Sequence, residues 1–242
     1  NDMKKITKYI PTIILTLLCS CSDYLDIVPD NVTTLDIVFN NRNTAERYLA
    51  NCYHFVPDHG SVKRIPGMGA GHECWFYTTN DSHFDNEVSF YIARGLQNID
   101  APYANYWDGE GGSNLPMFRA IRECNIFLDY VRDQHKVNDL TDSERKRWIA
   151  EVNVLKAYYH FFLFEHYGPI PIVDKALPVS TDPEGVKVTR MPVDQIVDYM
   201  VKLIDDSYKD LPPVITMEAT EMGRLTQPAA LALKAKILLW AA

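Results

Sequence analysis

The sequence lacks the motifs that mark the common catalytic sites. It has no Gly-x-Ser-x-Gly stretch, which would place a nucleophilic serine on a sharp turn. Gly67-x-Gly-x-Gly71 is not followed by the Gly-Lys-Ser/Thr of a phosphate-binding loop, so we interpret it as a flexible loop. His72-Glu73 has no second histidine four residues after the first, which excludes a zinc-protease helix. We therefore expect a protein that is not an enzyme.

Two other polar groups are weak candidates for metal sites. His160, Glu165 and His166 are close in sequence, but residues 160 and 166 point in roughly opposite directions on a helix, which favours packing or surface roles. The segment Asp108 to Ser113 is rich in oxygen ligands but lacks the spacing of a calcium loop, and we interpret it as a turn leading into a helix. We expect neither a metal nor a cofactor.

Positive charge is also in short supply. The 24 lysines and arginines are outnumbered by 32 aspartates and glutamates, giving a net charge of −8. This balance argues against nucleic acid and against anionic lipid as partners. Hydrophobic residues make up 47% of the chain, which is enough to form a core, so we expect one domain or two closely packed ones.

The beginning of the chain has the pattern of an export signal. Three lysines precede an apolar run, Ile10 through Leu18, that is too short to span a bilayer permanently, so residues 1–20 are predicted to be a signal peptide. The run ends in Leu18-Cys19-Ser20-Cys21, which resembles the lipobox of bacterial lipoproteins, whereas no A-x-A cleavage site follows. The box predicts Cys21 as the lipid attachment site, with the membrane contacted through this anchor only. Residues 21–38 are expected to form a tether.

Cysteine is scarce, and no pair has C-x-x-C spacing. If Cys19 is removed with the leader and Cys21 carries lipid, an odd number remains, namely Cys52, Cys74 and Cys124. We expect three buried free thiols. A single disulfide between Cys52 and Cys74 is the alternative.

Helical periodicity dominates the rest of the chain. It predicts five helices, at residues 44–53, 115–131, 142–167, 192–210 and 227–242. Between residues 56 and 114 glycines interrupt the periodicity while aromatic residues accumulate, which predicts a loop-rich insertion. Alanine and aromatic residues on the later helices favour tetratricopeptide-like pairs, 115–167 and 192–242. We therefore expect an all-α domain over residues 39–242, whose final helix is apolar on more than one face.

Four stretches resemble the SusD/RagB family of outer-membrane nutrient-binding lipoproteins. They are Cys21-Ser-Asp-Tyr-Leu-Asp-Ile-Val-Pro29; Asn105-Tyr-Trp107 with Phe118-Arg-Ala-Ile-Arg-Glu-Cys-Asn-Ile-Phe-Leu128; Glu151-Val-Asn-Val-Leu-Lys-Ala-Tyr-Tyr-His-Phe161 with Tyr167-Gly-Pro-Ile-Pro171; and Arg224-Leu-Thr with Ala229-Ala-Leu-Ala-Leu-Lys-Ala-Lys236. Their order along the chain makes the resemblance specific. Members of that family are much longer, so we expect this chain to be an N-terminal portion without its C-terminal half.

The resemblance implies a function. It implies a lipoprotein on the outer membrane, facing the cell exterior, that binds a nutrient, most often an oligosaccharide. It also implies delivery of that ligand to a TonB-dependent, SusC-like barrel transporter. Two alternatives stay open: a helical-repeat adapter that binds only protein, and a glycan hydrolase that uses two of the many carboxylates.

One segment, Cys74 to His83, has the composition of a sugar site. A sugar ring offers an apolar face and a rim of hydroxyl groups, so its site needs a flat aromatic side chain beside amides and carboxylates. We predict Trp75 and Tyr77 in the first role and Asn80 and Asp81 in the second, as ligand-binding residues. The alternative places Trp75 and Phe76 in the core, with Asn80-Asp81 as a turn. Trp107 matches a family position that packs at the start of a helix, so we expect it to be structural.

Overall fold

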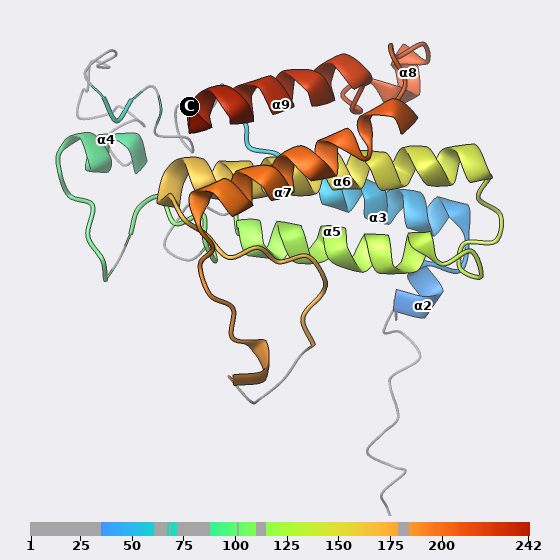
Figure 1. Cartoon of the computed structure of the whole chain (residues 1–242), viewed down its shortest axis with the longest axis horizontal. Coiled ribbons are helices and arrows are strands. Elements are labelled where there is room, and N and C mark those ends of the chain that lie inside the picture. Colours follow the sequence, from blue (N-terminus) through green and yellow to red (C-terminus); the bar gives the residue numbers. More distant parts are fainter. Residues whose placement is uncertain are drawn as a thin grey trace, which may run out of the picture. The chain divides into compact units, whose positions relative to one another are not determined.

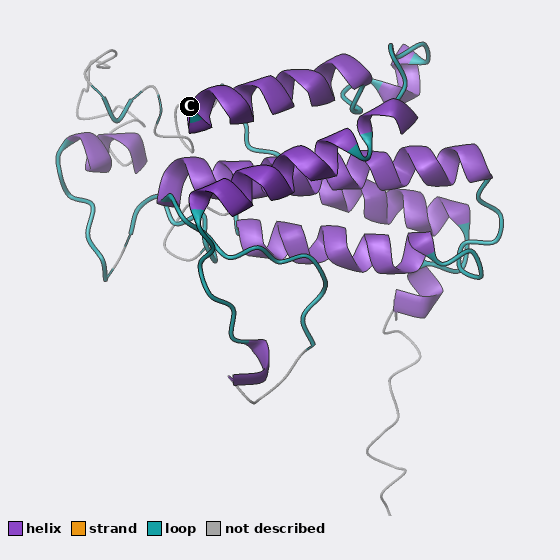
Figure 2. Cartoon of the chain, in the orientation of Figure 1, coloured by secondary structure: helices purple, strands orange, loops and turns teal. Residues whose placement is uncertain are grey.

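The structure is a computed structural model that describes residues 35–60, 67, 69–71, 88–100, 102–109, 115–178 and 184–242. The chain divides into a unit of residues 1–37 and a unit of residues 38–242. Within the described residues all regular secondary structure is helical (Figure 2), which confirms the expected all-α fold. Among those residues no helix is both long enough and apolar enough to cross a membrane.

All five predicted helices are present. The helices are α2 Leu35–Val38, α3 Arg42–His54, α4 Val88–Ala93, α5 Met117–Arg132, α6 Asp142–Tyr167, α7 Val193–Asp205, α8 Glu218–Glu221 and α9 Gln227–Ala241, with 3-10 turns at Glu184–Val186 and Tyr208–Asp210. Helix α2 covers the last four residues of the segment expected to be a tether, and α4 lies within the expected insertion.

Helix α6 is the centre of the 38–242 unit (Figure 1) and contacts α3, α5, α7 and α9. Its start is fixed by a capping box in which Thr141 and Glu144 each bind the other's backbone N–H. Its end is fixed by Gly168, whose φ of 68° is costly for residues with a Cβ. Because α6 has neighbours on most sides, its apolar residues surround it instead of forming one stripe.

Helix α7 ends earlier than expected. The sequence predicted a helix to about residue 210, but α7 ends at Asp205 and a 3-10 turn follows. The buried Asn153 of α6 donates a hydrogen bond of 3.0 Å to the hydroxyl of Ser207, and Leu211 is buried just beyond the turn. A tertiary contact therefore stops the helix where local periodicity would have continued it.

Among the described elements, helix α9 packs with one side on α7, α6 and the 3-10 turn Tyr208–Asp210. Ala230 and Ile237 are buried on that side. Leu239 is 80% exposed and Trp240 is 54% exposed, in agreement with the expectation that this helix is apolar on more than one face.

Candidate ligand-binding sites

The residues that the sequence singled out for function lie outside the described residues. This holds for the predicted lipid site, Cys21, and for the predicted ligand-binding residues Trp75, Tyr77, Asn80 and Asp81. Their assignments stay predictions. The structure does describe helices before and after the predicted segment. Residues of α3, α6 and α9 line an apolar pocket that the sequence did not indicate.

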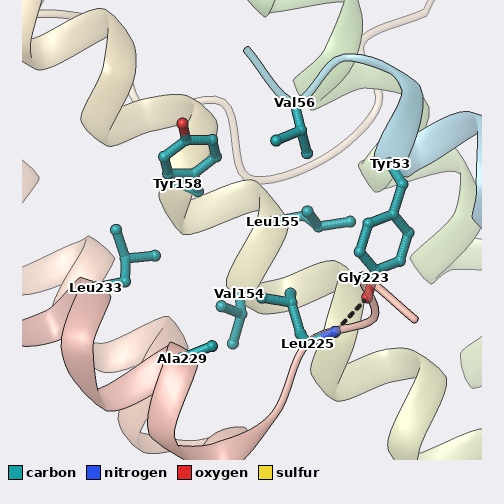
Figure 3. Close-up of a pocket in the computed structure, with 9 residues that line it drawn as sticks. All are labelled: Tyr53, Val56, Val154, Leu155, Tyr158, Gly223, Leu225, Ala229 and Leu233. Atoms are coloured by element: carbon teal, nitrogen blue, oxygen red, sulfur yellow. Dashed lines mark hydrogen bonds between the residues drawn. The ribbon is translucent and has the colours of Figure 1, made fainter. Parts of the chain in front are cut away.

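The pocket has a volume of about 440 Å³ and lies where α3, α6 and α9 approach one another (Figure 3). Its lining is mostly aliphatic and aromatic. It is formed by Tyr53, Val56, Val154, Leu155, Tyr158, Gly223, Leu225, Ala229 and Leu233. Sequence reasoning missed it because these residues come from four separate segments.

The two tyrosines of the pocket have their hydroxyl groups engaged. Tyr53 donates a hydrogen bond of 2.9 Å to Glu151 and accepts one of 3.1 Å from the backbone N–H of Leu225, the contact dashed in Figure 3. The hydroxyl of Tyr158 is hydrogen-bonded to Nε2 of His59 at 2.6 Å. Burial raises the pKa of Tyr158 to about 12, so its phenol is neutral at physiological pH. The pocket is suited to hold apolar surface, and its lining offers no acid–base pair.

A buried ionic network lies beside the pocket. The carboxylate of Glu151, fully buried on α6, accepts hydrogen bonds from Arg147 at 2.9 Å and from Arg224 at 2.9–3.2 Å. Both arginines also contact Glu221. Since Glu151 and Arg224 begin two of the quoted sequence motifs, the network shows that these motifs hold the segment before α9 against α6.

A second polar cluster fixes the chain after α6. Lys156, 1% exposed, donates to the carboxylate of Asp174 at 2.9 Å, and burial lowers the pKa of this lysine. His160 donates from Nδ1 to the carbonyl oxygen of Lys156, and its Nε2 accepts from the backbone N–H of Val173. Burial lowers the pKa of His160 to about 4, which keeps the imidazole in the neutral form that this pair of bonds requires.

His166 and Trp107 have packing roles, as expected. His166 binds the carbonyl oxygen of Phe162 through Nδ1 and packs between the rings of Phe162 and Tyr106. The ring of Trp107 lies 4.7 Å from that of Phe118, and Arg190 covers it at 5.1 Å. Among the described residues, no group of three or more His, Cys, Asp or Glu side chains could hold a metal ion.

Comparison with known proteins places this geometry in context. Residues 23–239 match the SusD-like family described as "Starch-binding associating with outer membrane". No curated protein matches the sequence.

Solved structures with the same fold include a laminarin binding SusD-like protein, with 18% identity and a TM-score of 0.63 over 84% of this chain and 41% of that one. A SusD-like protein from Bacteroides fragilis NCTC 9343 is 18% identical, with a TM-score of 0.64 over 87% and 37% of the two chains. Surface glycan-binding protein A from Bacteroides uniformis is 17% identical, with a TM-score of 0.60 over 82% and 42%. This chain therefore matches well under half the length of each.

Proposed function

This chain belongs to the SusD-like family of starch-binding proteins that associate with the outer membrane, and from that premise we propose that it is a lipid-anchored surface protein that binds an oligosaccharide. The family match over residues 23–239 is the observation that carries this proposal. We further propose that the bound glycan passes to a TonB-dependent, SusC-like barrel transporter. A tethered binding protein beside a pore raises the local ligand concentration, so delivery requires no catalysis.

The proposed sugar site is Trp75, Tyr77, Asn80 and Asp81. The aromatic rings would stack on the apolar face of a sugar, while the amide and the carboxylate would pair with its hydroxyl groups. In sequence the segment lies between α3 and α4, and α3 packs on α6.

Replacing Trp75 with alanine is expected to weaken oligosaccharide binding by about tenfold or more, because the stacking surface is removed. The whole protein should bind with a dissociation constant in the micromolar to millimolar range, roughly −8 to −4 kcal/mol. Isothermal titration calorimetry against starch- and laminarin-derived oligosaccharides measures this effect. Trp75→Phe is the matched control, because it keeps a flat aromatic ring at the same position and should therefore retain most of the affinity.

Three outcomes would contradict the proposal. A Trp75→Ala loss of twofold or less at unchanged melting temperature would place the sugar site elsewhere. Shortening of the oligosaccharide during overnight incubation, followed by chromatography, would favour the hydrolase alternative. Failure of the whole protein to bind any glycan, with capture of a protein partner instead, would favour the adapter.

The anchor has its own test. Cys21→Ala should move the protein from the membrane fraction to the soluble fraction, because the acyl chains that hold it are no longer attached. Cys19→Ala is the matched control: it changes the neighbouring cysteine but keeps Leu18, Ser20 and Cys21 of the box, so the protein should stay in the membrane. A Cys21→Ala protein that still partitions into detergent would show that the anchor assignment is wrong.

A further inference from the structure

Another hollow, which shares no residue with the apolar pocket, lies between the start of α5 and the chain after α6. It has a volume of about 220 Å³. Its walls are mainly apolar and are formed by Trp107, Phe118, Pro171, Val173, Leu177 and Val188. Pockets for drug-sized ligands have volumes of roughly 300–1,000 Å³, so this smaller hollow suits a single ring.

Hydrogen bonds from α5 hold one wall of the hollow in place. The side-chain amide of Asn125, which is buried on α5, donates to the carbonyl oxygen of Val173 at 3.0 Å. The guanidinium of Arg122 donates to the carbonyl oxygen of Leu177. The chain after α6 is therefore fixed against α5 by contacts within the protein, so little order is lost when a ligand enters.

Two cations line the hollow, Arg122 on α5 and Lys175 on the chain after α6. Among the residues that the structure describes, neither side chain forms an ion pair with a carboxylate. In contrast, Arg147 and Arg224 each pair with two carboxylates. Arg122 uses one N–H for Leu177, and the other donors of its planar guanidinium stay available to a ligand.

The carboxylate next in sequence to Lys175 is already engaged. Asp174 accepts a hydrogen bond of 2.9 Å from the buried Lys156 and another of 2.9 Å from the hydroxyl of Tyr199. The surroundings of the hollow are therefore positive, although the chain as a whole has a net charge of −8.

Two further features add positive charge at the same place. Arg190 covers the ring of Trp107 at 5.1 Å and donates hydrogen bonds to backbone carbonyl oxygens only. Phe118 is the second residue of α5, so the hollow lies at the N-terminal end of this helix, where the helix dipole favours an anion.

We propose that this hollow binds one acidic residue of an oligosaccharide, a sugar ring that carries a carboxylate or a sulfate group. This rests on the proposed glycan-binding function and names the class of sugar. The apolar face of the ring would lie on the aromatic and aliphatic walls, while the acidic group would accept charge-assisted hydrogen bonds from Arg122 and Lys175. A neutral ring would leave both cations without a partner.

The hollow complements the sugar site proposed around Trp75. That site has aromatic rings, an amide and a carboxylate, but no cation, so it gives no preference for an acidic sugar. The net charge of the chain disfavours large polyanions, whereas a single acidic ring interacts mainly with the charges within a Debye length of about 10 Å.

Isothermal titration calorimetry of the full chain tests the proposal with three matched ligands: digalacturonate, digalactose 6-sulfate and neutral digalactose. At least one acidic disaccharide should bind about tenfold more tightly than digalactose, since hydrogen bonds to charged groups are the stronger ones. The tighter of the two identifies the acidic group. Added salt should weaken this binding and leave that of digalactose unchanged.

Arg122→Gln and Lys175→Gln should each remove most of the acidic preference. Lys175 is exposed, so its variant keeps the fold even if Arg122→Gln loses stability with the bond to Leu177. Arg119→Gln is the matched control, because Arg119 is also on α5 but is 70% exposed and does not line the hollow. Equal affinity for all three disaccharides would overturn the proposal, as would an acidic preference that survives both substitutions.

The starch- and laminarin-derived oligosaccharides separate this failure from failure of the proposed function. A protein that binds them through Trp75 but has no acidic preference keeps the proposed function and loses the acidic subsite. A protein whose acidic preference depends on Arg122, while Trp75→Ala has no effect, keeps the acidic subsite and loses the site at Trp75. Absence of binding to every glycan would overturn both.

Discussion

Replacing Glu151 with glutamine is expected to lower the free energy of unfolding by about 3–5 kcal/mol, the usual effect of removing one partner from a buried ion pair. Glu151 is 0% exposed and receives hydrogen bonds from Arg147, Arg224 and Tyr53. Glutamine keeps the shape of the side chain but removes its negative charge. The two arginines then share Glu221 alone, and the segment before α9 loses the ion pair between Arg224 and α6.

Urea unfolding followed by circular dichroism measures this change. Glu46→Gln is the matched control, because Glu46 is also paired with an arginine, Arg42, but at the surface. Exposed ion pairs contribute about 0–1 kcal/mol, so this variant should be close to wild type. If Glu151→Gln loses less than about 1 kcal/mol, the network does not hold α6 and the segment before α9 together.

Phe162→Ala is expected to cost roughly 3–5 kcal/mol, the range for removing a large aromatic side chain from a packed core. Phe162 is 1% exposed on α6. Its ring meets that of Tyr106 edge-on at 4.9 Å and lies 4.3 Å from that of His166. Alanine would leave a cavity between α6 and the segment that leads into α5.

Leu239→Ala is the control in the same urea unfolding experiment. It removes an aliphatic side chain that is 80% exposed on α9. This control should change the free energy of unfolding by no more than about 0.5 kcal/mol. A Phe162→Ala protein with unchanged stability would place that face of α6 in solvent and would contradict the helix pairing. A large loss in Leu239→Ala would mean that the outer face of α9 is covered in solution.

The sequence determined the features that depend on neighbouring residues. The helices were predictable because apolar spacing, the Thr141–Glu144 capping box and the Gly168 terminus all act within a few residues. The family was predictable from four short motifs in order, and the match over residues 23–239 confirms it. The lipid site and the sugar-binding residues were read from equally local patterns, and they await the experiments above.

Only the tertiary structure decided which distant residues meet. Glu151 and Arg224 are far apart in the chain, and nothing in the local sequence around either residue predicts that they form an ion pair. The apolar pocket and the early end of α7 were missed for the same reason, since contacts between separate helices create both. Helical periodicity predicts which face of a helix is apolar. It does not predict which residues of α6 contact each of its four neighbouring helices, because that depends on how the helices pack.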